Sequence, residues 1–260
     1  MKVLRTAVAI SLLFVLTAPA ARRISFGRHP TGVSLRKRLH VNDLITEPGT
    51  AEIDFAGLYS WTSGLTTLPS ALKYTPEGSS LFWGRTEYSV SFDSVASTVN
   101  TGTRSTQFSD HLSFAATSVL FDSQHFDIAW STQVSPYLRG ESGLRVGGTM
   151  IARYDGGGNS IGATAGWTAA TIISDSNPAG VWDFGLGYGR KLGRFTPHAN
   201  VLLEKSTGFQ RTVAIFGGVE YQLTEHFAVD ATGQRLGLNG IGPDRPVLIG
   251  VTWNLGKPTR

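Results

Sequence analysis

The fold is predicted most directly by residues 180–191, which read GVWDFGLGYGRK. Large apolar side chains occupy the even positions from Trp182 to Tyr188, whereas Asp183 and three glycines occupy odd positions. Successive side chains of a β-strand point to opposite faces, so this pattern predicts a strand with one apolar face and one polar face. No helical stripe of apolar residues competes with it over any long window of the chain.

The same alternation recurs along the chain, with apolar residues on even positions in 125–137 and on odd positions in 246–255. A strand that crosses a membrane needs about 9–11 residues, and segments of this length repeat throughout the sequence. We predict strands at residues 51–62, 66–75, 85–96, 105–121, 125–137, 142–154, 158–171, 179–191, 194–206, 210–223, 226–236 and 244–255.

The links between the predicted strands alternate in length along the second half of the chain. Short links are expected at 122–124, 155–158, 192–193 and 224–225, and longer ones near 99–103, 172–178 and 237–243, while the link at 76–84 breaks the rule. Outer-membrane barrels have short periplasmic turns and longer external loops. We therefore predict an all-β fold, an antiparallel up-and-down transmembrane β-barrel of about 12 strands, with its tight links in the periplasm.

The composition excludes several other classes of protein. The 260 residues contain no cysteine, which removes disulfides, thiolate nucleophiles and cysteine zinc sites. Six Trp, seven Tyr and fourteen Phe can bury a large surface, which argues against disorder. The hydrophobic share of 41% does not suit a helical membrane bundle. A secreted soluble β-sandwich also alternates apolar and polar residues, so it remains an alternative.

The first residues have the pattern of a secretory signal peptide. Lys2 and Arg5 precede an apolar run over 7–16, and Ala18 and Ala20 form an A-x-A cleavage site. The run is too short to span a bilayer as a helix. We expect a signal peptide at 1–20, a basic leader or periplasmic segment at 21–50, a barrel at 51–256 and a tail at 257–260.

The charge is divided unevenly between the leader and the barrel. Residues 1–40 hold eight of the 23 basic residues and no acidic one, which leaves 15 basic and 19 acidic residues in 41–260, a net charge of −4. The barrel is therefore not expected to bind nucleic acid. The basic segment 21–40 could contact anionic lipid headgroups or be a solvated leader.

Three stretches carry a resemblance to a known family. They are HVNDLITEPGTAEID at 40–54, GGVEYQLTEHFAVD at 217–230 and DRPVLIGVTWNL at 244–255. The sequence resembles the bacterial outer-membrane proteins named for the MetA pathway of phenol degradation, as a pattern over 41–256. The resemblance implies a porin-like barrel that exports or takes up aromatic compounds. Barrel proteins usually end on an aromatic residue that the barrel-assembly machinery reads, whereas residues 254–260 follow Trp253 here.

If the apolar faces contact lipid, the opposite faces line the lumen. The charges there either line a water path or pair with one another to stiffen the wall. Twelve strands lie between the eight that side chains fill and the sixteen that leave an aqueous channel, so a narrow pore and a lumen plugged by 21–50 are both open. The pore-lining candidates are Glu52, Asp54, Glu87, Asp93, Asp127, Arg145, Arg153, Asp183, His198, Asn200, Glu204, Glu220 and Asp230.

No residue is predicted to be catalytic, to bind a cofactor or to bind a metal. The one G-x-S-x-G match, GNSIG at 158–162, lies at a predicted tight link between two strands, where no helix follows as a nucleophile elbow requires, and the six histidines are scattered without metal-ligand spacing. We predict a passive pore or transporter for small molecules in the bacterial outer membrane. Its expected partners are outer-membrane lipid, small-molecule solutes and the barrel-assembly machinery. The alternatives are a non-conducting barrel that binds a partner and, with less support, a barrel hydrolase.

Overall fold

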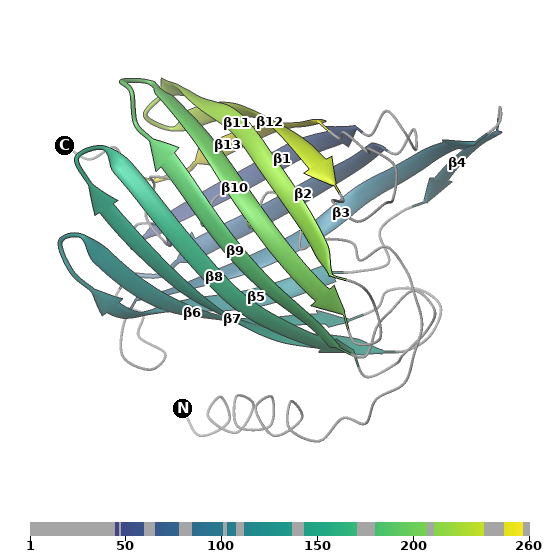
Figure 1. The fold of residues 1–260 in the computed structure, drawn as a ribbon, viewed down its shortest axis with the longest axis horizontal. Helices are drawn as coiled ribbons and strands as arrows, with labels where there is room; N and C mark the ends of the chain where they lie inside the picture. The colour runs from purple at the N-terminus through teal and green to yellow at the C-terminus, as the bar shows by residue number, and fades with distance from the viewer. Residues whose placement is uncertain are drawn as a thin grey trace.

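The chain forms a closed twelve-stranded antiparallel β-barrel in a computed structural model (Figure 1). The structure describes residues 45–46, 48–59, 66–77, 85–100, 103–107, 112–136, 143–170, 180–206, 211–236 and 247–256. Among these residues, no helix is long and apolar enough to cross a membrane.

The strands follow one another in chain order. They are β1 (Thr50–Tyr59), β2 (Thr66–Thr75), β3 (Thr86–Asn100), β4 (Thr103–Gln107), β5 (Leu112–Asp122), β6 (Phe126–Pro136), β7 (Leu144–Gly156), β8 (Asn159–Ala170), β9 (Gly180–Arg190), β10 (Phe195–Ser206), β11 (Thr212–Thr224), β12 (Phe227–Leu236) and β13 (Val247–Asn254).

The ring closes between the first and the last strand. β1 pairs with β13 in an antiparallel register that sets Glu52 opposite Asn254 and Tyr59 opposite Val247. Neighbours in the chain pair around the rest of the ring, except that β3 pairs with β5. β4 stands outside the ring and pairs with the outer part of β3, where both project from the barrel (Figure 1).

Eleven of the twelve predicted strands are confirmed with bounds that differ by at most four residues. The prediction of one strand over 105–121 is wrong at its beginning, because β5 starts at Leu112 and residues 103–107 form the separate strand β4. The sequence of β4, TRSTQ, favours extended backbone but has no apolar residue. It therefore lacks the lipid-facing side that a spanning strand needs and extends β3 beyond the ring.

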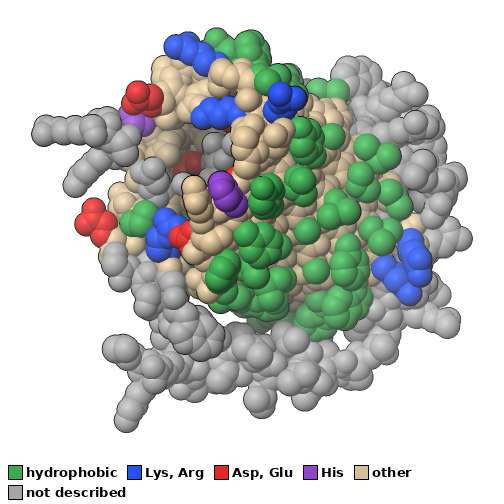
Figure 2. Space-filling model, turned by 60° about the vertical axis from the view of Figure 1, so that its left-hand side comes forward, with side chains coloured by type: hydrophobic (Ala, Val, Ile, Leu, Met, Phe, Trp, Pro, Cys, Tyr) green, Lys and Arg blue, Asp and Glu red, His purple; other side chains and the backbone are tan. Residues whose placement is uncertain are grey.

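The two faces of the wall differ as the alternation predicts. Large apolar side chains point outward and stay exposed, and Leu186 has an exposed fraction of 63%. Inward side chains such as Asp54, Thr117 and Ser131 are buried. A sandwich would bury its apolar faces between two sheets, so the closed ring with exposed apolar side chains excludes the β-sandwich fold. Figure 2 shows the apolar side chains covering the outer wall in a broad band.

The tight turns gather at one end of the barrel, at the left of Figure 1. They join β5 to β6, β7 to β8, β9 to β10 and β11 to β12, at the end where β1 begins and β13 finishes. Gly157 and Gly158 link β7 to β8 with positive φ angles of 60° and 77°. A two-residue hairpin of this kind needs positive φ at both positions, which glycine adopts without strain. We call this end the turn end.

Candidate functional site

The predicted lumen residues lie on the inner face wherever their side chains are described. They alternate along their strands with exposed apolar side chains, as Asp183 does with Trp182 and Phe184. The side chain of Asp93 lies outside the described residues. Those that are buried are Glu52, Asp54, Glu87, Arg153, His198, Asn200 and Asp230, and those that are partly buried are Asp127, Arg145, Asp183, Glu204 and Glu220.

One group of buried charges joins β1 to β2 near the turn end. The register sets Lys73 opposite Glu52, and the Lys73 Nζ atom lies 3.2 Å from Glu52 Oε1 and 2.7 Å from Asp54 Oδ2. The Thr252 hydroxyl on β13 donates to Asp54 Oδ1 at 2.7 Å. These contacts satisfy the charges inside the wall and tie three neighbouring strands together.

A second group, which we call the Arg153 cluster, joins β6 to β7. Arg153 is opposite Asp127 in the register, and its Nη2 atom lies 3.5 Å from Asp127 Oδ2. The Arg153 Nε atom lies 2.5 Å from Asp155 Oδ2, two residues further along β7. The Arg153 side chain is only 5% exposed, so both contacts form away from bulk water, where charge pairs are stronger.

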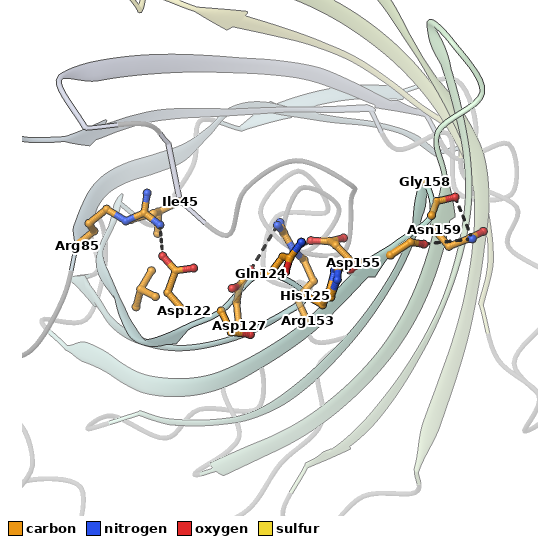
Figure 3. A pocket seen from close by; sticks show the side chains of 14 residues that line it. Ile45, Arg85, Asp122, Gln124, His125, Asp127, Arg153, Asp155, Gly158 and Asn159 are labelled. Atoms are coloured by element: carbon orange, nitrogen blue, oxygen red, sulfur yellow. Dashed lines mark hydrogen bonds and ion pairs between the residues drawn. The ribbon is translucent and has the colours of Figure 1, made fainter.

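The Arg153 cluster borders a cavity of about 480 Å³ at the turn end (Figure 3). On another part of its rim, Arg85 Nη2 donates to Asp122 Oδ2 at 2.7 Å, and both side chains are about half exposed. The lining residues are Ile45, Arg85, Val119, Asp122, Ser123, Gln124, His125, Asp127, Arg153, Asp155, Gly156, Gly157, Gly158 and Asn159. Figure 2 views this end and shows a hollow with an acidic side chain in its depth.

A chain of polar contacts crosses the opposite wall. The His198 Nε2 atom on β10 lies 3.0 Å from the Thr232 hydroxyl on β12, and that hydroxyl donates to Asp230 Oδ2 at 3.2 Å. Gly218 on the intervening strand is opposite both His198 and Thr232 in the register. Because glycine has no side chain, His198 can reach across β11 to Thr232.

Residues that precede β1 contact the inner wall. The Thr46 backbone N–H donates to Glu87 Oε2 at 2.7 Å, and the hydroxyls of Thr46 and Thr75 are 2.8 Å apart. Ile45 is buried and lines the cavity. Residues 45 and 46 are thus fixed inside the turn end, and residues 1–44 of the predicted signal peptide and leader lie outside the described part of the chain.

The end of the barrel opposite the turn end, which we call the loop end, carries a third group of charges. Glu204 on β10 is opposite Asp183 on β9, and the Arg145 guanidinium attracts the Glu204 carboxylate. The wall of β5 and β6 is neutral and polar there, because Gln133 donates to the hydroxyls of Ser113 and Ser135. The inner face is therefore hydrophilic at both ends of the barrel.

Several residues that complete these groups are not among the predicted lumen residues. Lys73 lies between the outward-facing Leu72 and Tyr74, so the alternation of β2 could have placed it in the lumen. Thr232 follows Asp230 by two residues, and Asp155 follows Arg153 by two, so the period of two assigns both to the inner face. Arg85 and Asp122 come from strand ends, where alternation gives no signal.

The charged groups do not converge on a metal site. Among the described residues, no group of three or more His, Cys, Asp or Glu side chains could hold a metal ion.

Comparison with solved structures identifies barrels of the same architecture. The KdgM porin in complex with disordered oligogalacturonate has 9% identity and a TM-score of 0.53, over 78% of this chain and 98% of that one. The NanC porin has 12% identity and a TM-score of 0.56, over 77% and 98%. An outer membrane channel from Pseudomonas putida F1 has 9% identity and a TM-score of 0.58, over 80% and 99%.

Comparison at the level of sequence finds no match. The sequence matches no protein-family model and no curated protein. At 9–12% identity, these likenesses show the fold, a closed antiparallel β-barrel like those of the three outer-membrane proteins.

Proposed function

We propose that this chain is a passive pore for small molecules in the bacterial outer membrane. One observation carries the proposal: the closed ring turns exposed apolar side chains outward and charged side chains inward. Such a wall suits lipid outside and water inside. The names of the similar structures, two porins and an outer membrane channel, support it. Outer-membrane lipid would surround the apolar band, after insertion by the barrel-assembly machinery.

We further propose that the pore prefers cations. Among the described inner-face side chains, nine are acidic and three are basic, a balance of −6. An excess of one charge along a narrow low-dielectric passage concentrates ions of the opposite sign. The acids are Glu52, Asp54, Glu87, Asp127, Asp155, Asp183, Glu204, Glu220 and Asp230, and the bases are Lys73, Arg145 and Arg153.

The test is a planar bilayer holding the refolded full chain between unequal KCl solutions. We expect discrete conductance steps and a reversal potential of the sign that K⁺ preference gives. The double variant Asp183→Asn, Glu204→Gln should move the reversal potential toward zero, because it removes two inner-face charges. Glu225→Gln is the matched control, since Glu225 is exposed in the turn between β11 and β12. Anion preference in the unaltered chain would contradict the charge argument.

The solute class is a finer proposal. Because the sequence resembles the phenol-degradation family, we propose aromatic compounds as the transported solutes. Phenol added to one side of the bilayer should interrupt the open-channel current more often than cyclohexanol at the same concentration. Equal interruption by the two alcohols would remove the support for aromatic solutes and leave the pore itself in place.

A second candidate function is a barrel that does not conduct. It is favoured by the buried ion pairs of Lys73 and Arg153, which satisfy charges of the wall internally. A silent bilayer, with folding shown by the heat-dependent gel mobility of the same protein, would support this candidate over the pore. The external loops would then be the expected binding surface for a partner.

A further inference from the structure

Buried oxygens that lack a hydrogen-bond partner gather in one region of the inner wall. Asp127 and Asp155 each give one carboxylate oxygen to Arg153, and the second oxygen of each, Oδ1, makes no hydrogen bond of good geometry, although the Ser123 backbone N–H lies close to the Asp127 carboxylate. The side-chain oxygens of Ser160 and Asn200 also lack one, although these residues are only 0% and 6% exposed. Buried polar atoms are normally paired, so this concentration points to a missing partner.

The strand register places these residues on either side of two buried glycines, which we call the glycine floor. Arg153 on β7 is opposite Gly162 on β8, which is opposite Gly187 on β9, which in turn is opposite Asn200 on β10. Two glycines therefore separate the Arg153 cluster from Asn200, and this row of described residues has no side chain between them. In the next row, Asp155 is opposite Ser160. The cavity of about 480 Å³ adjoins this floor, since Asp127 and Asp155 line it.

The chemistry of the unpartnered atoms defines the missing group. A carboxylate oxygen and an amide oxygen accept hydrogen bonds and cannot donate them, so the partner must be a donor. Two of the acceptors belong to carboxylates, which favours a positively charged donor. The described part of the chain offers no cluster suited to a metal ion. An ion that carries several N–H groups can satisfy acceptors that are spread over a wider area, and the cavity has the volume of a small-molecule site.

We propose that the turn end of the lumen holds a binding site for a small organic ammonium ion, with Asp127 and Asp155 as its anionic side and Asn200 on the far edge of the glycine floor. Access to the site rests on the proposed pore, whereas binding itself requires only the folded barrel. As a solute passes, such a site would favour amine-bearing molecules over neutral molecules of the same shape.

The first experiment is titration calorimetry on the refolded full chain in detergent. The probe is 1,4-diaminobutane, and 1,4-butanediol is its uncharged match. We expect binding of the diamine only. The double variant Asp127→Asn, Asp155→Asn should weaken binding by about tenfold or more, because charge-assisted hydrogen bonds are lost. Asp183→Asn at the loop end should change the affinity less than about twofold, since charges beyond a Debye length are screened. Equal losses of diamine affinity in the two variants would overturn the proposal of a site at the turn end.

A further variant controls for misfolding, because the double variant removes the two carboxylates that contact the buried Arg153. Asn200→Ala leaves the Arg153 cluster intact and removes one acceptor at the edge of the floor. It should weaken diamine binding several-fold in a barrel whose heat-dependent gel mobility is unchanged. Unaltered affinity in Asn200→Ala would remove this residue from the site, and the diamine and the diol binding equally would overturn the proposal.

The bilayer separates this proposal from the pore itself. If both the pore and the site exist, the diamine should shorten the open intervals of the unaltered chain. In the double variant Asp127→Asn, Asp155→Asn, the same diamine concentration should shorten them less. Calorimetric binding together with a silent bilayer would uphold the site and contradict the pore. Clear conductance with neither block nor calorimetric binding would uphold the pore and overturn the site.

Discussion

Replacing Arg153 by Met should lower the free energy of unfolding of the barrel by about 3–5 kcal/mol, as expected when one partner of a buried ion pair is removed. The reason is the environment of Asp127 and Asp155, which share the Arg153 guanidinium, a cation that is 5% exposed. Met fills a similar volume, so the loss reports mainly the two carboxylates left without that charge. The measurement is urea unfolding in detergent, followed by tryptophan fluorescence.

Two comparisons separate this effect from a general cost of removing arginine. Arg85→Met breaks the ion pair with Asp122, but these side chains are 45% and 54% exposed, so the loss should be about 0–1 kcal/mol. Adding Asp127→Asn and Asp155→Asn to Arg153→Met should restore much of the stability, because no buried charge then lacks a partner. If Arg153→Met cost no more than Arg85→Met, the cluster would have to be solvated.

The sequence was sufficient for most of the wall because the lipid imposes a strict period of two. In β9, Trp182, Leu186 and Tyr188 must all face outward, and a slip of one residue would place Asp183 in contact with lipid. The pattern therefore predicts both the strand and the face of each residue. It fails at β4, whose polar residues meet no lipid, so its sequence carries no alternation.

The partners within the lumen were harder to predict than the lumen residues themselves. Alternation assigns Asp54 to the inner face, but only the register between β1 and β2 brings Lys73 within 2.7 Å of it. The register between two strands depends on how the whole strands align, and it cannot be read from one sequence. For the same reason, the row from Arg153 to Asn200, which crosses four strands, could not be predicted from the sequence.

Replacing Leu186 by Arg should lower the free energy of unfolding by about 2–4 kcal/mol in a lipid bilayer, as for a cation on the lipid face near the midplane. Leu186 lies next to the midpoint of β9 and is 63% exposed on the outer wall. An arginine there would have no water and no acid within its own face. Urea unfolding of the barrel in lipid vesicles measures the loss.

The matched variant is Thr149→Arg, near the midpoint of β7 and on its inner face. Thr149 is opposite Gly166, over which the Asp183 carboxylate lies, so the new guanidinium would enter a hydrophilic lumen beside an acid. Its cost should be well below that of Leu186→Arg, because the two substitutions differ in the face they occupy rather than in the residue introduced. Equal costs would mean that the inner wall is as dry as the lipid face, which would contradict the pore and favour a closed barrel.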